Sequence, residues 1–141
     1  MRRIFVLVAL SQMFVACSDN GVEVAPGTLP RPNSLVEAQR LILGRWEWVK
    51  SIYPGDLEST PASTGHTQQM IFTADGVMQV YRDGQLALTG TYEIRCWGTN
   101  YSLVWDDWPW QNFCIAGNYF SYDQRESDGC YALYVRSGAW H

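Results

Sequence analysis

The sequence predicts an all-β domain, an eight-stranded antiparallel up-and-down barrel with one short helix before it. Eight short runs rich in apolar and aromatic residues follow one another between residues 45 and 136. Turn dipeptides that favour the positive φ angles of hairpins stand at four of the joints: Asp75-Gly76, Asp83-Gly84, Gly117-Asn118 and Asp128-Gly129. Successive hairpins without intervening helices indicate an antiparallel meander, which either a barrel or a sandwich can close.

Residues 1–16 have the features of a bacterial export signal. Arg2-Arg3 gives a positive start, and the apolar part, residues 4–16, is thirteen residues long. A membrane-spanning helix needs about 20 residues, so the segment is predicted to be a signal peptide. The small Ala16 directly before Cys17 resembles the lipobox of bacterial lipoproteins. The resemblance implies lipidation of Cys17 and a place in the cell envelope, with the outer membrane as the expected site. A plain secretory signal that leaves Cys17 as a free thiol is the alternative.

Residues 17–33 are predicted to be a flexible tether. The stretch 18–33 holds three prolines and two glycines and shows no apolar periodicity, as is typical of a spacer. Without the leader, eight Lys and Arg face fourteen Asp and Glu, a net charge of −6. Nucleic acids and anionic lipid surfaces require clustered positive charge. We therefore expect no nucleic-acid partner, and membrane contact only through the N-terminal lipid.

The helix is expected directly after the tether. Ser34 can cap it, and Glu37 stands three residues later, the spacing of a capping box. Apolar residues then fall on one face, and Gly44 ends the segment. A helix of about ten residues is unstable alone, so this one must pack against the rest of the domain, residues 34–141.

The strand runs begin at Arg45 with Trp46 and Trp48 on the same side. The loop at residues 53–67 is long for a hairpin and is a candidate gate over the barrel mouth. The seven runs after it are Gln68–Thr73, Val77–Arg82, Leu86–Arg95, Tyr101–Trp105, Gln111–Ala116, Tyr119–Tyr122 and Cys130–Arg136.

Residues at the two ends of this strand pattern resemble those of a known protein family. Gly44-x-Trp46 opens the first strand just after a short helix, and Arg136 ends the last strand. Together with the segment 60–65 and the strand after it, these features resemble lipocalins, and more closely the short lipocalin-like lipoproteins of gut-type bacteria. The resemblance spans roughly residues 41–136. It implies that Trp46 packs across the closed end of the barrel, and that Arg136 stacks over the indole and bonds the backbone of the helical segment.

The resemblance also implies a binding module for a small hydrophobic or amphipathic ligand. By the alternation of side chains along strands, the cavity would be lined by five residues: Trp48, Met78, Val80, Tyr92 and Leu103. A barrel of eight strands has an interior that side chains can fill or that can hold one small ligand, and the sequence leaves both open.

The segment Trp105–Trp110 supports an alternative function. Trp105, Trp108 and Trp110 flank two carboxylates, so they could form a cavity-less platform that binds a glycan or a protein. The structural alternative is that these rings fold back and close one end of the barrel. Adjacent Asp106 and Asp107 would point to opposite sides of an extended chain, which disfavours a catalytic pair.

Three cysteines follow Cys17, and an oxidising compartment favours one disulfide among them. Cys96 with Cys114 is preferred over a bond to Cys130, because it encloses the Trp-rich segment. Closing that loop would contribute about 3 kcal/mol. No Cys or His pair has the spacing of a metal site, and no nucleophile motif is present. We therefore expect a non-catalytic protein without metal or cofactor.

Overall fold

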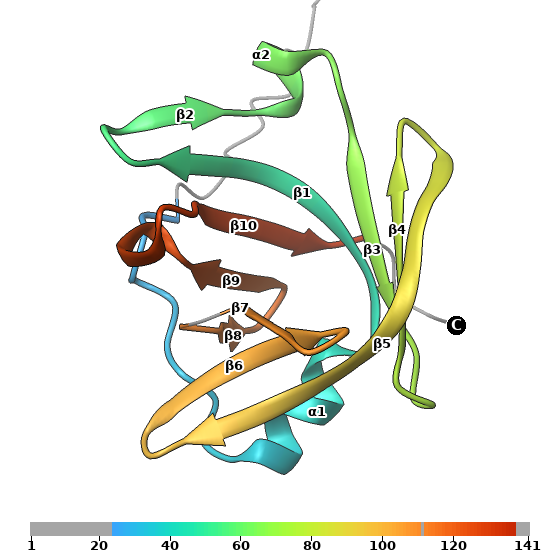
Figure 1. Ribbon diagram of the computed structural model, residues 1–141, viewed down its shortest axis with the longest axis vertical. Coiled ribbons are helices and arrows are strands. Elements are labelled where there is room, and N and C mark those ends of the chain that lie inside the picture. The colour runs from blue at the N-terminus through green and yellow to red at the C-terminus, as the bar shows by residue number, and fades with distance from the viewer. Residues whose placement is uncertain (1–23, 111, 138–141) are drawn as a thin grey trace, which may run out of the picture.

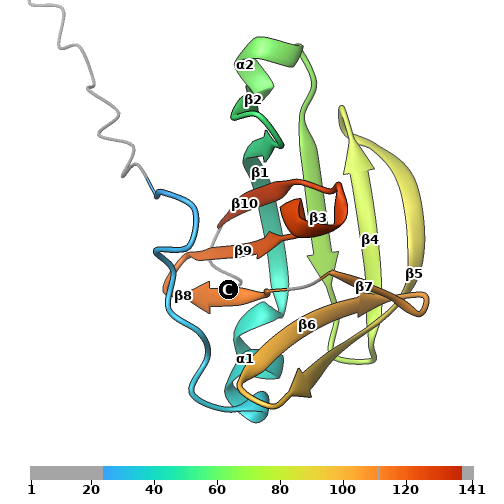
Figure 2. The same cartoon turned by 60° about the vertical axis from the view of Figure 1, so that its left-hand side comes forward.

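The computed structural model describes residues 24–110 and 112–137, and these residues form one antiparallel sheet that curls into a half-barrel (Figures 1 and 2). The strand order across the sheet is β7-β6-β5-β4-β3-β1-β10-β9-β8, with β2 paired to β1. The predicted antiparallel all-β class is confirmed. The leader, Cys17 and the residues up to 23 lie outside the described part of the chain.

The element bounds largely follow the predicted runs. The helices are α1 (Leu35–Ile42), α2 (Pro61–Thr64) and the short 3-10 helix η1 (Arg125–Ser127). The strands are β1 (Gly44–Tyr53), β2 (Leu57–Ser59), β3 (Gln68–Phe72), β4 (Val77–Arg82), β5 (Gln85–Trp97), β6 (Asn100–Trp105), β7 (Trp108–Trp110), β8 (Cys114–Ala116), β9 (Tyr119–Asp123) and β10 (Tyr131–Arg136).

The described residues thus hold ten strands, where the sequence predicted eight. The two additional strands, β2 and β7, are three residues long and lie outside the eight predicted strand runs. β2 folds the chain back onto the end of β1. β7 contains Pro109, which cannot donate to a ladder, but β7 is the edge of the sheet and pairs only with β6. An edge strand tolerates proline.

The two ends of the sheet meet without a continuous ladder. Among the described residues no strand pairing joins β7 to β8. Single contacts bridge this seam instead. The Phe113 amide donates to the Tyr101 carbonyl (2.9 Å), and the Trp110 ring stacks on Tyr122 at 4.7 Å between centroids. The half-barrel is therefore closed on this side mainly by ring packing.

Helix α1 closes the lower end in Figure 1. Ser34 caps it by accepting a hydrogen bond from the Glu37 amide (3.1 Å). Trp46, fully buried, donates from its indole nitrogen to the Ile42 carbonyl (2.7 Å). The Arg136 guanidinium lies 4.2 Å from the centroid of the Trp46 ring and donates to the carbonyls of Leu41 (2.5 Å) and Leu43 (2.8 Å). This group ties the first and last strands to the helix.

The predicted tether differs from the structure in its second half. Residues 24–33, called the strap below, lie along the outside of the sheet (Figure 2). Val24 is buried against Tyr131 and Leu133, the outward-facing side chains of β10. Arg31 donates to the Thr99 carbonyl (3.3 Å) in the β5–β6 turn. The strap thus covers apolar side chains on the outer face of β10, so the prediction of a wholly flexible tether is wrong from Val24 onward.

Strand β5 is shared between two neighbours, because it pairs with β4 up to Thr91 and with β6 from Tyr92. Gly90 stands at this change of partner. A Cβ at this position would lie 2.2 Å from the indole nitrogen of Trp105 and 2.6 Å from a carboxylate oxygen of Asp106. The same carboxylate accepts a hydrogen bond from the Thr91 amide (3.1 Å), at the point where β5 changes its partner from β4 to β6. Only glycine leaves room for this close approach.

Candidate functional site

The lower barrel is filled by side chains. Met78, Val80 and Leu103 are buried in the core, together with a cluster of rings around Phe120, so they line no cavity. Phe120 stacks on Tyr134 with 4.7 Å between centroids. The predicted cavity lining is therefore wrong for these three residues: they do face inward, but at a depth where α1 and the rings of the opposite strands fill the space.

Tyr92 belongs to the same packed region. Its ring meets Phe72 edge to face at 4.9 Å, and its hydroxyl donates to the Thr73 carbonyl (2.8 Å). The phenol is thus engaged within the protein. Of the five residues predicted to line the cavity, Trp48 borders a pocket at the upper end of the half-barrel, and Tyr92 borders a separate pocket beside Asp106 and Asp107.

The pocket that Trp48 borders lies at the upper end of the half-barrel and has a volume of about 360 Å³; we call it the mouth pocket. Three groups of side chains surround it: rings from the inner sheet face, polar groups at the strand ends, and residues of the predicted gate. They are Trp48, Ser51, Tyr53, Thr64, His66, Thr67, Gln68, Arg82, Tyr122, Cys130 and Tyr134.

The register of β3 and β4 explains why the inner face becomes polar toward this end. Met70 pairs with Val80, and both are buried. Two residues farther along, Gln68 pairs with Arg82. Because alternate residues of a strand share a face, the second pair continues the same inward row. The row thus ends at the rim with an amide and a guanidinium.

The inner wall of the pocket consists of neutral aromatic groups. Gln68 donates from its side-chain nitrogen to the Tyr134 hydroxyl (2.8 Å), and the Trp48 indole donates to the Ser51 hydroxyl (3.0 Å). Burial raises the pKa of Tyr134 and of Tyr122 above the ordinary value. Burial also raises the pKa of the half-buried Cys130 thiol. These groups therefore stay uncharged at neutral pH.

The predicted gate lines the other side. Its short helix α2 carries a capping box between Thr60 and Ser63. The loop that follows is fastened to the β4–β5 turn, because the Thr67 amide donates to Asp83 (2.8 Å) and the His66 Nδ1 lies 2.8 Å from the same carboxylate. The Thr67 amide and His66 lower the pKa of Asp83. The loop is thus held in place over the pocket.

The described residues that line the mouth pocket include one guanidinium, that of Arg82 at the rim, and no carboxylate. None of the ion pairs formed by the described part of the chain includes Arg82. The Asp83 carboxylate, next to Arg82 in the chain, is instead bonded to Thr67 and His66.

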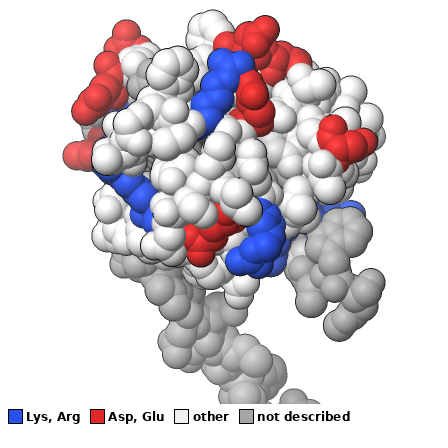
Figure 3. Space-filling model, turned by 90° about the horizontal axis from the view of Figure 1, so that it is seen from below, with Lys and Arg blue, Asp and Glu red and all other residues white. Residues whose placement is uncertain are grey.

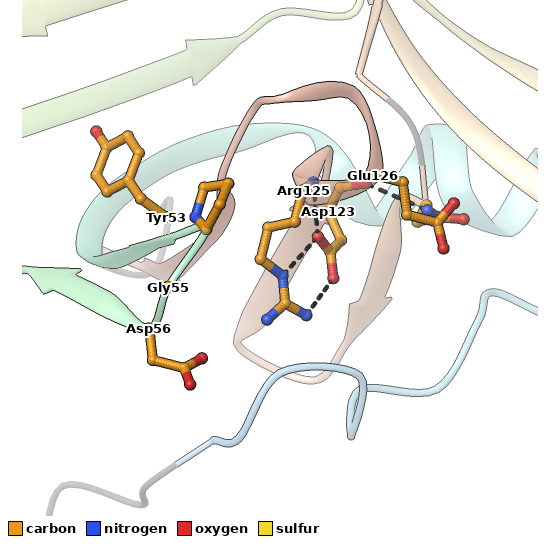
Figure 4. A pocket seen from close by; sticks show the side chains of 8 residues that line it. Tyr53, Gly55, Asp56, Asp123, Arg125 and Glu126 are labelled. Atoms are coloured by element: carbon orange, nitrogen blue, oxygen red, sulfur yellow. Dashed lines mark hydrogen bonds and ion pairs between the residues drawn. The ribbon is translucent and has the colours of Figure 1, made fainter.

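A second pocket, of about 370 Å³, lies beside the β1–β2 turn (Figure 4). Its central feature is a two-point ion pair in which Arg125 donates to both Asp123 oxygens (2.9 and 2.7 Å). Figure 4 shows the guanidinium turned toward Asp123, with the Asp56 side chain separate from this pair. Arg125 and Asp123 thus neutralise each other, and the other charged residues that line this pocket, Asp56 and Glu126, are both acidic.

The three tryptophans of the alternative platform do not share one surface. Trp105 packs edge to face on Trp110 (5.8 Å), and both contact the core. Only Trp108 is solvent-exposed, at 70%. The platform hypothesis is therefore wrong in this form. Sequence reasoning also overlooked Trp97, which is 64% exposed at the end of β5.

The three described cysteines are all free thiols, so the predicted Cys96–Cys114 disulfide is not formed. Cys96 is exposed, and its thiol donates to the Gly98 carbonyl (3.3 Å) within its own hairpin turn. Cys114 is half-buried on β8, in another part of the sheet. The pair was predicted because the two cysteines flank the Trp-rich segment in the sequence, but the fold places them in different parts of the sheet.

Within the described ranges, no three His, Cys, Asp or Glu side chains gather closely enough to hold a metal ion. No described helix has the length and apolarity needed to span a bilayer. Comparisons with protein-family models, curated proteins and solved structures found no match to this chain. The likeness to lipocalin-like lipoproteins therefore stays a hypothesis that rests on the residues described above.

Proposed function

We propose that this chain is a lipid-anchored, lipocalin-like binding module that holds a small amphipathic ligand in the mouth pocket. The observation that carries the proposal is the pocket itself, with aromatic walls on one side and, at the rim, a guanidinium that forms no ion pair with the described residues. Ligand pockets commonly measure about 300–1,000 Å³ and combine apolar walls with a few polar groups. The apolar part of the ligand would lie on Trp48 and Tyr122, and its polar or anionic part would face Arg82.

The lipocalin-like part of the proposal draws support from the closed end. The short helix, the indole of Trp46 and the guanidinium of Arg136 are combined there as the family resemblance implies. The anchor is proposed from the leader and Cys17 alone. Attachment to the cell envelope would place the pocket near a source of amphipathic molecules.

Two dyes with a common ring system test the proposal on the purified chain. N-phenyl-1-naphthylamine is neutral, and 8-anilinonaphthalene-1-sulfonate carries the same rings with an added sulfonate. We expect both dyes to fluoresce on binding, and Trp48→Ala to weaken both. Arg82→Gln should weaken the sulfonate alone, by about fivefold, the equivalent of roughly 1 kcal/mol for a solvent-facing ion pair.

Cys130 gives a second measurement, because its thiol borders the pocket. Bound dye should slow its alkylation and leave the exposed Cys96 unaffected. Trp108→Ala is the matched control, since it removes an exposed indole that does not line the pocket. Dye binding that survives Trp48→Ala, or that leaves Cys130 as reactive as before, would place the dye elsewhere and contradict the proposal.

A further inference from the structure

A shallow groove of about 320 Å³ lies on the outer face of the sheet, near the β5–β6 turn. It is lined by Trp97, Asn100, Ser102, Pro109 and Asn112. Ser102 pairs with Arg95 on β5 and Trp97 pairs with Asn100. These side chains alternate with the buried Ile94, Tyr101 and Leu103, so they point away from the barrel interior. The groove and the mouth pocket share no residue.

The groove combines one exposed indole face with uncharged polar groups. Asn112 donates from its side-chain nitrogen to the Asp123 carbonyl (3.2 Å), which orients the amide and leaves its oxygen available. The hydrogen bonds of the described residues do not engage the side chains of Asn100 and Ser102 or the indole nitrogen of Trp97. Ser102 is buried, so the accessible donors and acceptors beside the exposed ring are those of Asn100 and Asn112.

Within the described part of the chain, no charged residue lines this groove. The lower end of the molecule, where the β5–β6 turn lies in Figure 1, is shown from below in Figure 3. Most of that face is uncharged, and its acidic and basic side chains lie interspersed. A strongly charged ligand would find no compensating charge among the residues that border the groove.

We infer that this groove binds a neutral saccharide. The C–H face of a sugar ring can lie on the apolar surface of Trp97, while its hydroxyls pair with Asn100 and Asn112. An indole is suited to such a boundary, since it presents a large apolar face together with one polar N–H. A proline-rich peptide is the competing ligand, but its recognition uses grooves lined by several aromatic rings. Here the groove has a single indole.

Affinity electrophoresis tests the inference on the full chain. Native gels would contain a soluble neutral polysaccharide: laminarin, xylan, galactomannan or soluble starch, each in a separate gel. We expect at least one to retard the chain, and Trp97→Ala to reduce the retardation at least tenfold, with Asn100→Ala reducing it less. The matched control is Trp108→Ala, which removes an indole of similar exposure (70% against 64% for Trp97) outside the groove.

Three results would overturn the inference. One is the absence of retardation with all four polysaccharides. Another is retardation that Trp97→Ala leaves intact, or that Trp108→Ala abolishes to the same extent. The third is binding of a proline-rich peptide that depends on Trp97 while the polysaccharides do not bind. Near-ultraviolet circular dichroism of Trp97→Ala checks that the variant is folded, and Asn100→Ala provides a second variant that leaves every indole in place. The mouth pocket remains intact in both variants, so the dye assay stays an independent measurement.

Discussion

Replacing Arg136 with Met should destabilise the fold by about 3 kcal/mol. The substitution keeps a long apolar side chain but removes the charge that lies 4.2 Å from the Trp46 ring centroid and the donors to two helix-end carbonyls. Hydrogen bonds from a charged group contribute about 1.5–3 kcal/mol each, and a cation over an indole adds about 0.5–2 kcal/mol. Burial of the guanidinium, which lowers the pKa of Arg136, offsets part of this sum. The carbonyls of Leu41 and Leu43 would lose their donors.

Urea unfolding at pH 7, followed by tryptophan fluorescence, measures the loss. Arg136→Lys should lose less than Arg136→Met, because one ammonium keeps the charge but lacks the planar set of donors. Arg40→Met is the control. It removes an exposed charge from the same helix and should change the free energy of unfolding by at most about 0.5 kcal/mol. A loss below about 1 kcal/mol in Arg136→Met would refute the view that this group fastens the closed end.

Three further predictions concern single sites. Gly90→Ala should cost about 1–3 kcal/mol by overpacking against the neighbouring indole, seen as a lower Tm by calorimetry; an unchanged Tm would contradict this. Arg125 lowers the pKa of Asp123, so the carboxylate stabilises the fold above its ordinary pKa of 3.8, and this contribution is lost as pH falls through the lower folded value. Asp123→Asn should therefore show a smaller fall in urea midpoint than the parent between pH 5 and pH 3, and parallel curves would argue against it. The exposed Cys96 should react with iodoacetamide faster than Cys130, whose pKa burial raises, as peptide mass spectrometry can measure; equal rates would exclude the described environments.

Local signals in the sequence were sufficient for most of the fold. The cap at Ser34 and the turn at Asp83-Gly84 depend on contacts within a few residues, so their positions could be read from the chain. The strand β7 could not, because Pro109 is excluded from a central strand and only its place at the sheet edge makes it acceptable. The strap was missed because its packing residues, Val24 and Leu29, stand among prolines and glycines and show no helix or strand periodicity.

The candidate site was harder to predict, because it depends on depth along the barrel. Alternation correctly places Trp48 and Met78 on the inner face, but only Trp48 lies high enough to border open space. Depth is set by how the sheet curls and by how much of the interior α1 fills, and neither follows from periodicity. For the same reason Trp97 and Trp105 look alike in the sequence, although one is exposed and the other is packed.

Docking of Val24 on the outside of β10 also limits how far the domain can travel. If Cys17 carries acyl chains, seven residue steps separate the lipid from Val24, the first packed residue of the described part of the chain, and seven steps span at most about 25 Å. A chain free up to residue 33 would more than double that radius. The domain would then stay within a thin layer next to the bilayer. There it would meet molecules as they enter or leave the lipid surface, and it would not reach farther into the compartment.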